Sequence, residues 1–218
     1  MTHVDVLIVG AGISGIGSAC HLLNKCPGKS FKIVEARTEY GGTWDLFRYP
    51  GIRSDSDMHT LGFNFKPWVA EKSIADGPSI KKYLKETIDE NDLAHHIQYE
   101  TKVIAANWSV KDRTWNVDIV QNEQASQLSC KFLMMCSGYY DYEKPFRPDF
   151  ENEDVFTGHI IHPQLWPKDL DYKDKKVIVI GSGATAMTLV PALADKAESV
   201  TMVQRSPTYV VSMPDEDR

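Results

Sequence analysis

The sequence predicts an α/β protein, and three observations carry this prediction. The short, β-branched run Val4–Val9 is followed by a glycine-rich turn and then by apolar residues at helical spacing. The same order returns near the end of the sequence, where the run Lys176–Ile180 precedes a second glycine-rich turn. Between them, from Ile97 to Val120, apolar residues tend to alternate with polar ones, which is typical of antiparallel strands. We therefore expect two β–α–β openings with a small antiparallel β meander between them.

The first opening continues with a helix over Ile16–Asn24 and a second strand at Phe31–Val34. The region Gly41–Trp68 is rich in glycine, proline and aromatic residues and has no clear period, so it is expected to be a long loop or a set of short helices. Helical spacing returns in Ser79–Glu90, where Ile80, Tyr83, Leu84 and Ile88 share a face. A buried strand is then predicted at Lys131–Cys136.

The second opening follows a proline-rich connection over Tyr139–Asp174. Its strand at Lys176–Ile180 leads into a helix over Ala184–Lys196 and a strand at Val200–Val203. A doubly wound domain needs more strands than these two to cover its sheet, so the second domain is expected to be incomplete. The predicted organisation is residues 1–150, a linker at residues 151–175, and residues 176–218.

Composition and charge exclude several classes of protein. Hydrophobic residues make up 42% of the chain and charged residues 25%, which is typical of a globular protein, and the net charge of −6 argues against nucleic-acid binding. The apolar start contains Asp5, lacks a basic lead-in and is too short to span a bilayer. None of the four cysteines lies in a CxxC pair, so neither a metal site nor a disulfide framework is expected, and we predict a cytoplasmic protein.

The first glycine-rich turn reads Gly10-Ala-Gly12-Ile-Ser14-Gly15. In such a turn the first glycine makes the bend, the second lets a pyrophosphate approach the backbone, and the third lets helix and strand pack closely. Glu35 follows Gly15 by 20 residues, at the end of the second strand, where a carboxylate accepts hydrogen bonds from a ribose diol and repels a 2′-phosphate. This context predicts a Rossmann-like dinucleotide-binding domain suited to FAD; the alternative is a glycine turn without a ligand.

The second turn has the same form but different chemistry at the next strand. Gln204 stands where the first opening has its acid, and Arg205 follows. Loss of a carboxylate and gain of a guanidinium suit a 2′-phosphate, so a second Rossmann-like domain that prefers NADPH over NADH is predicted. The alternative is that Arg205 is a solvated surface charge. The predicted contacts are Gly181, Ser182, Gly183, Ala184, Thr185, Ala186, Arg205 and Ser206.

Two longer segments complete the pattern. Phe156–Pro167 reads FTGHIIHPQLWP, and Gly41–Asp55 reads GGTWDLFRYPGIRSD. The first resembles the fingerprint of class B flavoprotein monooxygenases, in the Trp-Pro form typical of Baeyer–Villiger monooxygenases, and the second resembles the GGTW…RYPGxRxD stretch of the same family. The two turns and the two segments occur in the family's order over essentially the whole chain. From the residues alone, His162 is more readily explained as a satisfied structural histidine.

The resemblance implies which residues meet the cofactors. In the family the GGTW residues line the flavin, and the last aspartate of the stretch lies between flavin and nicotinamide, which makes Asp55 the candidate catalytic residue. The alternative for Asp55 is a salt bridge with Arg48 or Arg53. The family's catalytic arginine falls beyond the second turn, outside this sequence. The implied cofactor contacts are Gly42, Thr43, Trp44, Asp45, Leu46, Arg53, Ser54, Asp55 and, through its backbone, Val103.

The activity that the resemblance implies is that of a flavin-dependent monooxygenase. Such an enzyme uses NADPH and O2 to insert one oxygen atom into a small organic substrate through a C4a-peroxyflavin, converting a ketone to an ester or oxygenating nitrogen or sulfur. An FAD/NAD(P)H disulfide reductase is the weaker alternative, because no cysteine follows Gly41-Gly42 or Gly181 closely. The third alternative is a catalytically incompetent FAD-binding half, since an incomplete second sheet would expose a strand edge for a dimer or a partner chain to cover.

Overall fold

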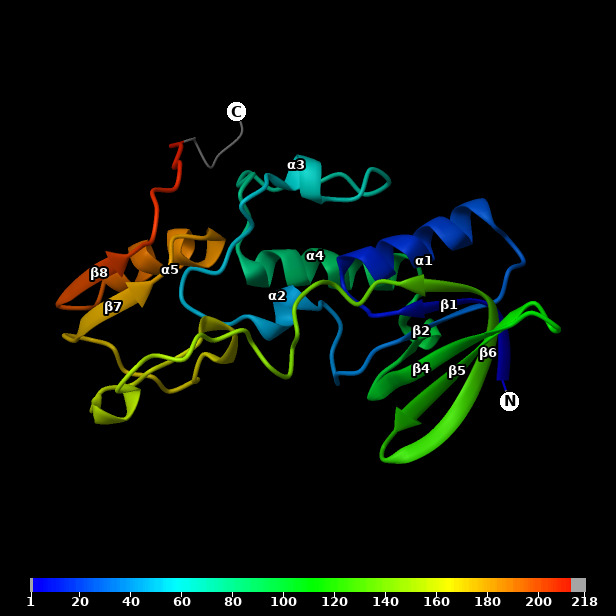
Figure 1. Cartoon of the computed structure of the whole chain (residues 1–218). Helices are drawn as coiled ribbons and strands as arrows, with labels where there is room; N and C mark the ends of the chain where they lie inside the picture. The colour runs from blue at the N-terminus through cyan, green and yellow to red at the C-terminus, as the bar shows by residue number, and fades with distance from the viewer. Residues whose placement is uncertain (1, 213–218) are drawn as a thin grey trace. The chain divides into compact units, whose positions relative to one another are not determined.

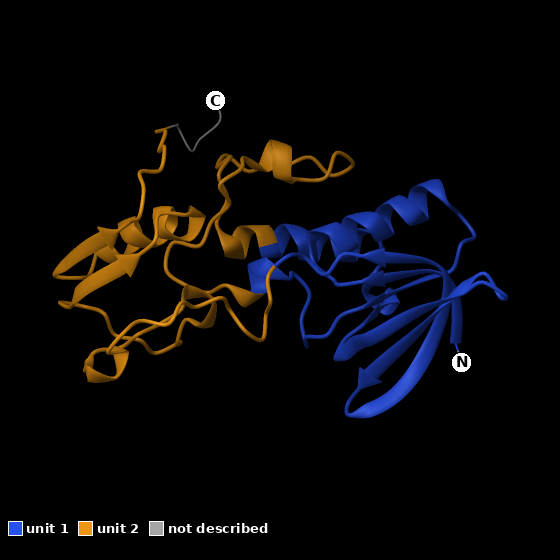
Figure 2. Ribbon diagram, viewed as in Figure 1, with its two compact units in different colours: residues 1–45, 81–139 blue, residues 46–80, 140–218 orange. Residues whose placement is uncertain are grey.

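The computed structural model describes residues 2–212 (Figure 1). The chain forms two compact units, each drawn from two segments (Figure 2). The first unit consists of Met1–Asp45 and Lys81–Tyr139, and the second of Leu46–Ile80 and Tyr140–Arg218. The domains predicted from the sequence, residues 1–150, 151–175 and 176–218, are each one continuous segment, unlike these two units. The domain boundaries stay a prediction. The two units alternate along the sequence because Phe47 and Tyr49 of segment 46–80 pack with Leu189 and Leu193 in the core of the second unit.

The first unit contains one six-stranded sheet, in the order β3-β2-β1-β6-β5-β4. The four strands at the β3 end are parallel, with β1 between β2 and β6, while β4, β5 and β6 are antiparallel neighbours. Short β-branched strands at the centre are typical of a sheet that is buried on both faces. The strands are β1 (Thr2–Val9), β2 (Phe31–Val34), β3 (Ile97–Gln98), β4 (Thr101–Ser109), β5 (Thr114–Gln121) and β6 (Gln124–Met135).

Strand β6 belongs both to the antiparallel meander and to the parallel part of the sheet, which the sequence had suggested were formed by separate strands. Its first part pairs antiparallel with β5, up to the pair Trp115–Cys130, and its later part pairs parallel with β1, up to the pair Val9–Met135. The strand predicted at Lys131–Cys136 therefore begins earlier, at Gln124, as the last strand of the meander. The prediction that it is buried was wrong, because none of residues 131–136 is buried and Phe132 and Met135 are 67% and 63% exposed. The predicted start of the meander was also wrong, because Ile97 pairs in parallel with Ile33 of β2.

Helix α1 (Ile13–Lys25) packs on the first unit's sheet, whereas α3 (Met58–Leu61) and the first residues of α4 (Gly77–Glu90) belong to segment 46–80 of the second unit. Helix α1 begins three residues before the predicted start and packs along β1 and β2 (Figure 1). Helix α4 has the predicted apolar face, since Ile80, Tyr83, Leu84 and Ile88 are all at most 4% exposed. The region predicted as a loop or short helices contains α2 (Thr43–Leu46) and α3, and a short 3-10 helix, η1 (Ala94–His96), precedes β3.

The second unit contains a two-stranded parallel sheet, and one helix connects its two strands along the chain. Strand β7 (Lys176–Ile180) is the predicted strand, α5 (Ala184–Ala194) ends two residues before the predicted end, and β8 (Ser199–Val203) begins one residue earlier than predicted. Its core consists of Phe47, Tyr49, Leu189 and Leu193. Two 3-10 helices, η2 (Glu153–Val155) and η3 (Pro163–Leu165), lie in the proline-rich connection.

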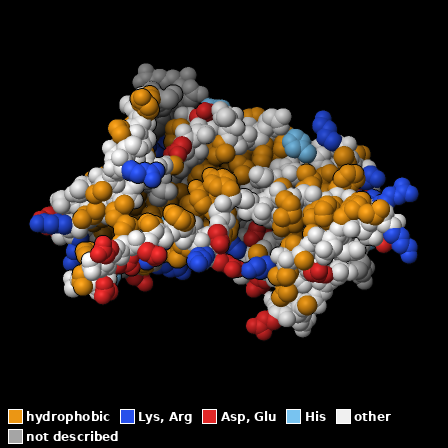
Figure 3. All heavy atoms as spheres, viewed as in Figure 1, with side chains coloured by type: hydrophobic (Ala, Val, Ile, Leu, Met, Phe, Trp, Pro, Cys, Tyr) orange, Lys and Arg blue, Asp and Glu red, His pale blue; other side chains and the backbone are white. Residues whose placement is uncertain are grey.

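Positively charged side chains are dispersed over the face in view. Figure 3 shows lysine and arginine side chains scattered among acidic and apolar ones on this face, not gathered in a patch. Within residues 2–212, no helix has the length and apolar character needed to cross a bilayer. The same part of the chain holds no group of three or more histidine, cysteine or acidic side chains arranged to bind a metal ion.

Candidate functional site

The first glycine turn is a tight bend that only glycine permits. Gly10 follows β1 with φ +106°, and its N–H donates to the carbonyl of Val34 at 2.8 Å. A Cβ at this position would lie 2.5 Å from the carbonyl oxygen of Cys136, and a Cβ on Gly15 would run into the carbonyl oxygen of Gly10. Both predicted glycine requirements therefore have a physical reason: backbone conformation at the first position, and close approach of α1 to the turn at the other.

Helix α1 begins with no side chain across its N-terminus. Gly12 is the N-cap residue, in an extended conformation, and no side chain caps the helix. The first N–H to bond within the helix is that of Ile16, which donates to Gly12 at 3.0 Å, and the side chain of Ser14 points to solvent. Backbone N–H groups of the first turn and the positive end of the helix dipole are thus available to an anion, which fits the pyrophosphate of a dinucleotide.

Glu35 directly follows β2, and its side chain bonds the backbone of the first glycine turn. Its side chain is 7% exposed, and its two carboxylate oxygens accept hydrogen bonds from the backbone N–H of Ala11 at 2.8 Å and of Arg37 at 2.9 Å. Each carboxylate oxygen can accept more than one hydrogen bond, so Glu35 retains capacity for a ribose hydroxyl. The carboxylate is held beside the turn by the chain itself.

The Gly41–Asp45 loop lies against the first turn. The N–H of Gly41 donates to the carbonyl of Ala11 at 2.9 Å, and a Cβ on Gly12 would be 3.8 Å from the Cα of Gly42. Gly41 and Gly42 both have positive φ, of +108° and +54°, which lets the chain turn sharply into α2. The structure therefore brings Gly42, Thr43 and Trp44 to the same place as Gly10–Gly15, with Thr43 and Trp44 half-buried.

Asp45 is the most enclosed charged side chain of this loop. It is 3% exposed and forms ion pairs of 2.5 Å with Arg37 and with Lys81. Burial acts to raise the pKa of Asp45, but the hydrogen bond and charge of Lys81 and the charge of Arg37 outweigh it and hold the pKa below its ordinary value. The sequence analysis did not single out Arg37 or Lys81. No local signal could have found them, because Asp45 and Lys81 are 36 positions apart.

The next residues of the GGTW…RYPG stretch belong to the second unit. Phe47 and Tyr49 are buried with Leu189 and Leu193 of α5, and Leu46 packs against this core. Gly51 has φ +80°, and a Cβ there would lie 2.8 Å from the Cβ of Ala192. Packing on α5 thus explains Tyr49 and Gly51 of the RYPG sequence.

Three further residues of the stretch follow. Arg53 is exposed and forms an isolated antiparallel bridge with Asp76, and Ser54 is 5% exposed, with its N–H donating to the carbonyl of Ala75 at 2.9 Å. The side-chain oxygen of Ser54 accepts from the N–H of Ser56 at 3.1 Å. Asp55 is exposed and forms no salt bridge with any described residue, so neither Arg48 nor Arg53 neutralises it there.

The second glycine turn repeats the backbone of the first. Gly181 has φ +125°, and its N–H donates to the carbonyl of Val203 at 2.8 Å. Gly183 is an extended N-cap without a side-chain hydrogen bond, and the N–H of Met187 donates to it at 3.1 Å. Ala186 is buried in the position of the third glycine, and the side-chain oxygen of Ser182 accepts from Thr208 at 2.9 Å. Ala184 is exposed and Thr185 half-buried beside them.

Arg205 and Ser206 follow β8 and are exposed. Within residues 2–212 the guanidinium of Arg205 forms no ion pair. Gln204, the counterpart of Glu35, is exposed as well, so no carboxylate occupies the strand end beside this turn. The arrangement leaves a cation and a hydroxyl at the position where a dinucleotide's adenosine ribose is bound in Rossmann-like folds.

The fingerprint segment has a structural role in the second unit. Nδ1 of His162 accepts the N–H of Gln164 at 3.2 Å, and burial lowers the pKa of His162, although a hydrogen bond to the backbone of Phe146 opposes the shift. Gln164, 6% exposed, donates to the carbonyl of Asp141 at 2.6 Å. Trp166 meets Tyr172 edge-on, with ring centroids 6.2 Å apart. His162 is thus hydrogen-bonded within the second unit, in agreement with the structural role expected from the residues alone.

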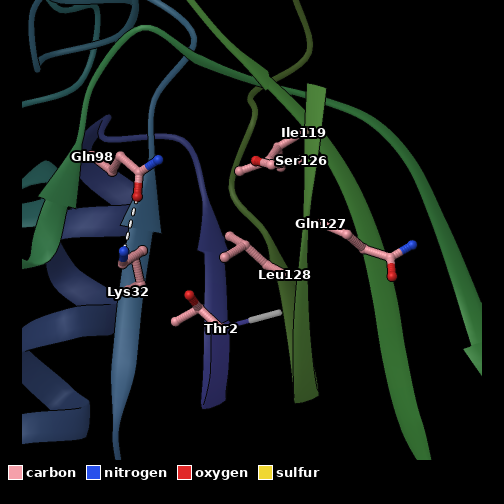
Figure 4. Close-up of a pocket in the computed structure, with 7 residues that line it drawn as sticks. All are labelled: Thr2, Lys32, Gln98, Ile119, Ser126, Gln127 and Leu128. Carbon is pink, nitrogen blue, oxygen red and sulfur yellow. Dashed lines mark hydrogen bonds between the residues drawn. The ribbon is translucent and has the colours of Figure 1, made fainter. Parts of the chain in front are cut away.

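Val103 lies two residues after Thr101, whose N–H donates to the carbonyl of Glu35 at 2.8 Å, so β4 begins beside Glu35. Val103 is half-buried in β4, opposite Ile119 and next to an irregularity in the pairing. The hollow in Figure 4 lies elsewhere in the first unit. The hollow has a volume of about 380 Å³ and includes Thr2 at the start of β1, whereas the glycine turn follows the end of that strand. Nζ of Lys32 donates to Oε1 of Gln98 there, at 2.8 Å. Dinucleotides bind at the carboxyl ends of parallel strands, so this hollow is not part of the candidate site.

The fold and the two turns define an α/β protein of the dinucleotide-binding class. A family model described as flavin-binding monooxygenase-like matches residues 73–217, and one for a NAD(P)-binding Rossmann-like domain matches residues 8–72. The chain belongs to the flavin-binding monooxygenase-like family. The resemblance indicated by the sequence motifs is thereby confirmed.

Curated relatives agree with this assignment. The FAD-containing monooxygenase EthA of Mycobacterium tuberculosis (strain ATCC 25618 / H37Rv) is 57% identical over 216 residues, and the probable FAD-binding monooxygenase AlmA of Acinetobacter baylyi is 56% identical over 217 residues. Each match covers 99% of this chain but 44% of the relative. The chain therefore spans less than half the length of these relatives.

Solved structures extend the similarity to the fold. An oxidized steroid monooxygenase bound to NADP superposes with a TM-score of 0.83 at 31% identity, over 96% of this chain and 40% of that one. Cyclohexanone monooxygenase from Rhodococcus sp. Phi1, bound to NADP+, gives a TM-score of 0.81 at 30% identity, over 96% of this chain and 39% of that one. The predicted α/β class with Rossmann-like domains is confirmed.

Proposed function

We propose that this chain supplies the FAD-binding part, and the beginning of the NADPH-binding part, of a flavin-dependent monooxygenase. The reaction inserts one atom of O2 into a small organic substrate, converting a ketone to an ester or oxygenating nitrogen or sulfur. Family membership supports this proposal, together with relatives that are named FAD-containing monooxygenases and similar structures that are bound to NADP. When bound, the flavin supplies the redox and oxygen chemistry, and the protein supplies binding and orientation.

The observation that carries the proposal is the uncapped start of α1 beside a buried carboxylate. The backbone from Gly12 to Gly15 would hold the pyrophosphate of FAD, and Glu35 would accept a ribose hydroxyl. Gly42, Thr43 and Trp44 lie against this turn and would contact the flavin side of the cofactor. Val103 would contribute a backbone contact to the adenine. These residues bind and orient; none of them is proposed to transfer a proton.

The second turn would hold NADPH in the same manner. The uncapped start of α5 at Gly183 suits its pyrophosphate, and Arg205 with Ser206 suits its 2′-phosphate. Asp55 is the proposed catalytic residue, because its exposed carboxylate forms no salt bridge with a described residue and can accept a hydrogen bond near the cofactors. Arg53 and Ser54 would place it there.

The cysteines support a monooxygenase over a disulfide reductase. All four are free thiols. Burial raises the pKa of Cys20 to about 11 and raises that of Cys130, so both are held as unreactive thiols. A redox-active pair needs a thiol with a lowered pKa.

A second candidate is an FAD-binding half that requires a partner chain or a second copy. One face of the two-stranded sheet supports it, because Ile178 and Ile180 of β7 are 65% and 64% exposed and Val203 of β8 is 47% exposed. Apolar side chains so exposed on a sheet mark an association surface. A cytoplasmic location belongs with this proposal as an expectation.

The absorption spectrum of the purified chain tests the proposed function. We expect a flavin band, either as purified or after FAD is added and excess removed, and bleaching of the band by NADPH under nitrogen. Protein that takes up no FAD would contradict the assignment of the first turn. Flavin that is retained but not bleached by NADPH would favour the FAD-binding half.

A further inference from the structure

A buried cluster of three charges lies beside the first turn. It consists of Asp45 at the end of the Gly41–Asp45 loop, Arg37 just after β2, and Lys81 on α4, and we name it the Asp45 cluster. The carboxylate is 3% exposed, whereas the two cationic side chains are 24% and 28% exposed. A carboxylate that is removed from water to this extent requires compensation, and two cations with short hydrogen bonds provide it.

The cluster uses both oxygens of the carboxylate. Nη2 of Arg37 bonds Oδ2 of Asp45, and Nζ of Lys81 bonds Oδ1, each at 2.5 Å. Resemblance to the family implies that Asp45 contacts FAD. In the structure its two oxygens are instead turned to Arg37 and Lys81, so its role is best explained by what these contacts hold in place.

What they hold is the loop that touches the first turn. Arg37 bonds the loop at two points, because its Nη1 also donates to the carbonyl of Gly42 at 3.2 Å. Lys81 contacts the chain on both sides of the loop. Besides its bond to Asp45, its Nζ lies 5.1 Å from the ring centroid of Tyr40 and 3.5 Å from a carboxylate oxygen of Glu39, the two residues that precede the loop. The planar fork of an arginine suits two acceptors at once, whereas a lysine acts as a single charge.

We propose that Arg37 and Lys81 are positioning residues, which fix the Gly41–Asp45 loop against the first glycine turn through the carboxylate of Asp45. Gly41 bonds Ala11 of that turn, so displacement of the loop displaces the surface that the turn presents. Insofar as the turn holds FAD, which rests on the proposed function, the Asp45 cluster sets FAD affinity without contacting the cofactor. A shift of a binding surface by a fraction of an ångström is sufficient to weaken a preorganised site.

Hydrogen exchange of the chain without FAD tests the positioning itself. Lys81→Gln removes one bond to Asp45, and Lys85→Gln is the matched control, because Lys85 is on the same helix but pairs with Asp89 at the surface. We expect amides of residues 41–45 to exchange about tenfold faster in the Lys81 variant, with wild-type rates in the control. Lys81→Arg keeps the charge and should restore slow exchange. Equal rates in Lys81→Gln and Lys85→Gln would overturn the proposal.

Titration with FAD tests the consequence for binding. Lys81→Gln and Arg37→Lys should each raise the Kd for FAD about tenfold, while Lys85→Gln leaves it unchanged. The absorption and visible circular dichroism of bound flavin should shift in the same two variants, which a loss of general stability would not produce. If the wild-type chain binds no FAD, the proposed function fails while the exchange result still decides the positioning. An Asp45→Asn variant that alters the flavin spectrum while Lys81→Gln does not would indicate direct contact, and would refute the proposal.

Discussion

The two glycine turns have nearly the same backbone and very different surroundings. Gly10 and Gly181 have φ of +106° and +125°, and each donates its N–H to a valine carbonyl of the next strand at 2.8 Å. The N-cap glycines have φ of −80° and −79°. A Cβ on Gly10 would meet backbone at 2.5 Å, whereas a Cβ on Gly181 or Gly183 would meet no atom within 4 Å.

The neighbouring strands account for this difference. Strand β1 is flanked by β2 and β6, and Cys136, just after β6, closes over Gly10. Strand β7 has β8 as its one neighbour in the described sheet, and no atom of residues 2–212 lies within 4 Å of the place that a Cβ on Gly181 would take. The bend itself is therefore a local property of the strand–glycine–helix sequence, while the tolerance of each glycine to substitution is set by neighbours far along the chain.

The largest effect should come from the third position of each turn. Gly15→Ala would drive a Cβ into the carbonyl of Gly10, so we expect a loss of about 4 kcal/mol in the free energy of unfolding. The second turn already has Ala186 there, and Ala186→Gly should cost only about 1 kcal/mol through helix propensity. Urea unfolding of both variants measures this. Similar losses in the two variants would contradict the close approach of α1 to the first glycine turn.

The first glycines provide the next comparison. Gly10→Ala and Gly181→Ala both force an alanine to a positive φ, which costs about 1–3 kcal/mol. Only Gly10→Ala adds a clash with Cys136, worth a further ~1–3 kcal/mol. The difference between the two midpoints of urea unfolding reports the clash alone. A larger loss for Gly181→Ala would contradict the open surroundings of the second turn.

The strand ends distinguish the turns by ligand. Arg205→Ala should raise the NADPH concentration needed for half-bleaching of the flavin by about 10- to 100-fold, since a charge-assisted bond to the 2′-phosphate contributes about 1.5–3 kcal/mol. The value for NADH should change little, because NADH lacks this phosphate. An equal effect on the two nucleotides would remove Arg205 from the site.

The smallest effect concerns acid. The pKa of Asp45 is lowered in the folded chain, so its ion pairs stabilise the first unit fully above the ordinary carboxyl pKa of about 3.9 and this contribution is lost as the pH falls further. The midpoint of urea unfolding should fall as the pH is lowered below about 4, and less steeply in Asp45→Asn. An unchanged slope would show that other carboxylates, such as Asp5 with its lowered pKa, carry the acid sensitivity.

The sequence by itself determined both turns and the elements beside them. Strands β2 and β7 have the predicted bounds, and the predicted apolar face of α4 is buried, because strand and helix periods and the glycine requirement for positive φ are properties of neighbouring residues. The cofactor contacts assigned to these residues, and the role of Asp55, stay predictions.

Only the tertiary structure decided which distant segments meet. The double pairing of β6, the packing of Phe47 and Tyr49 on α5, and the partners of Asp45 all join positions far apart in the chain. A buried charge selects its partner by proximity in the folded state, and side-chain pattern alone does not encode that proximity. For this reason the sequence placed Asp45 in a loop predicted to contact the flavin but could not show that Arg37 and Lys81 hold it there.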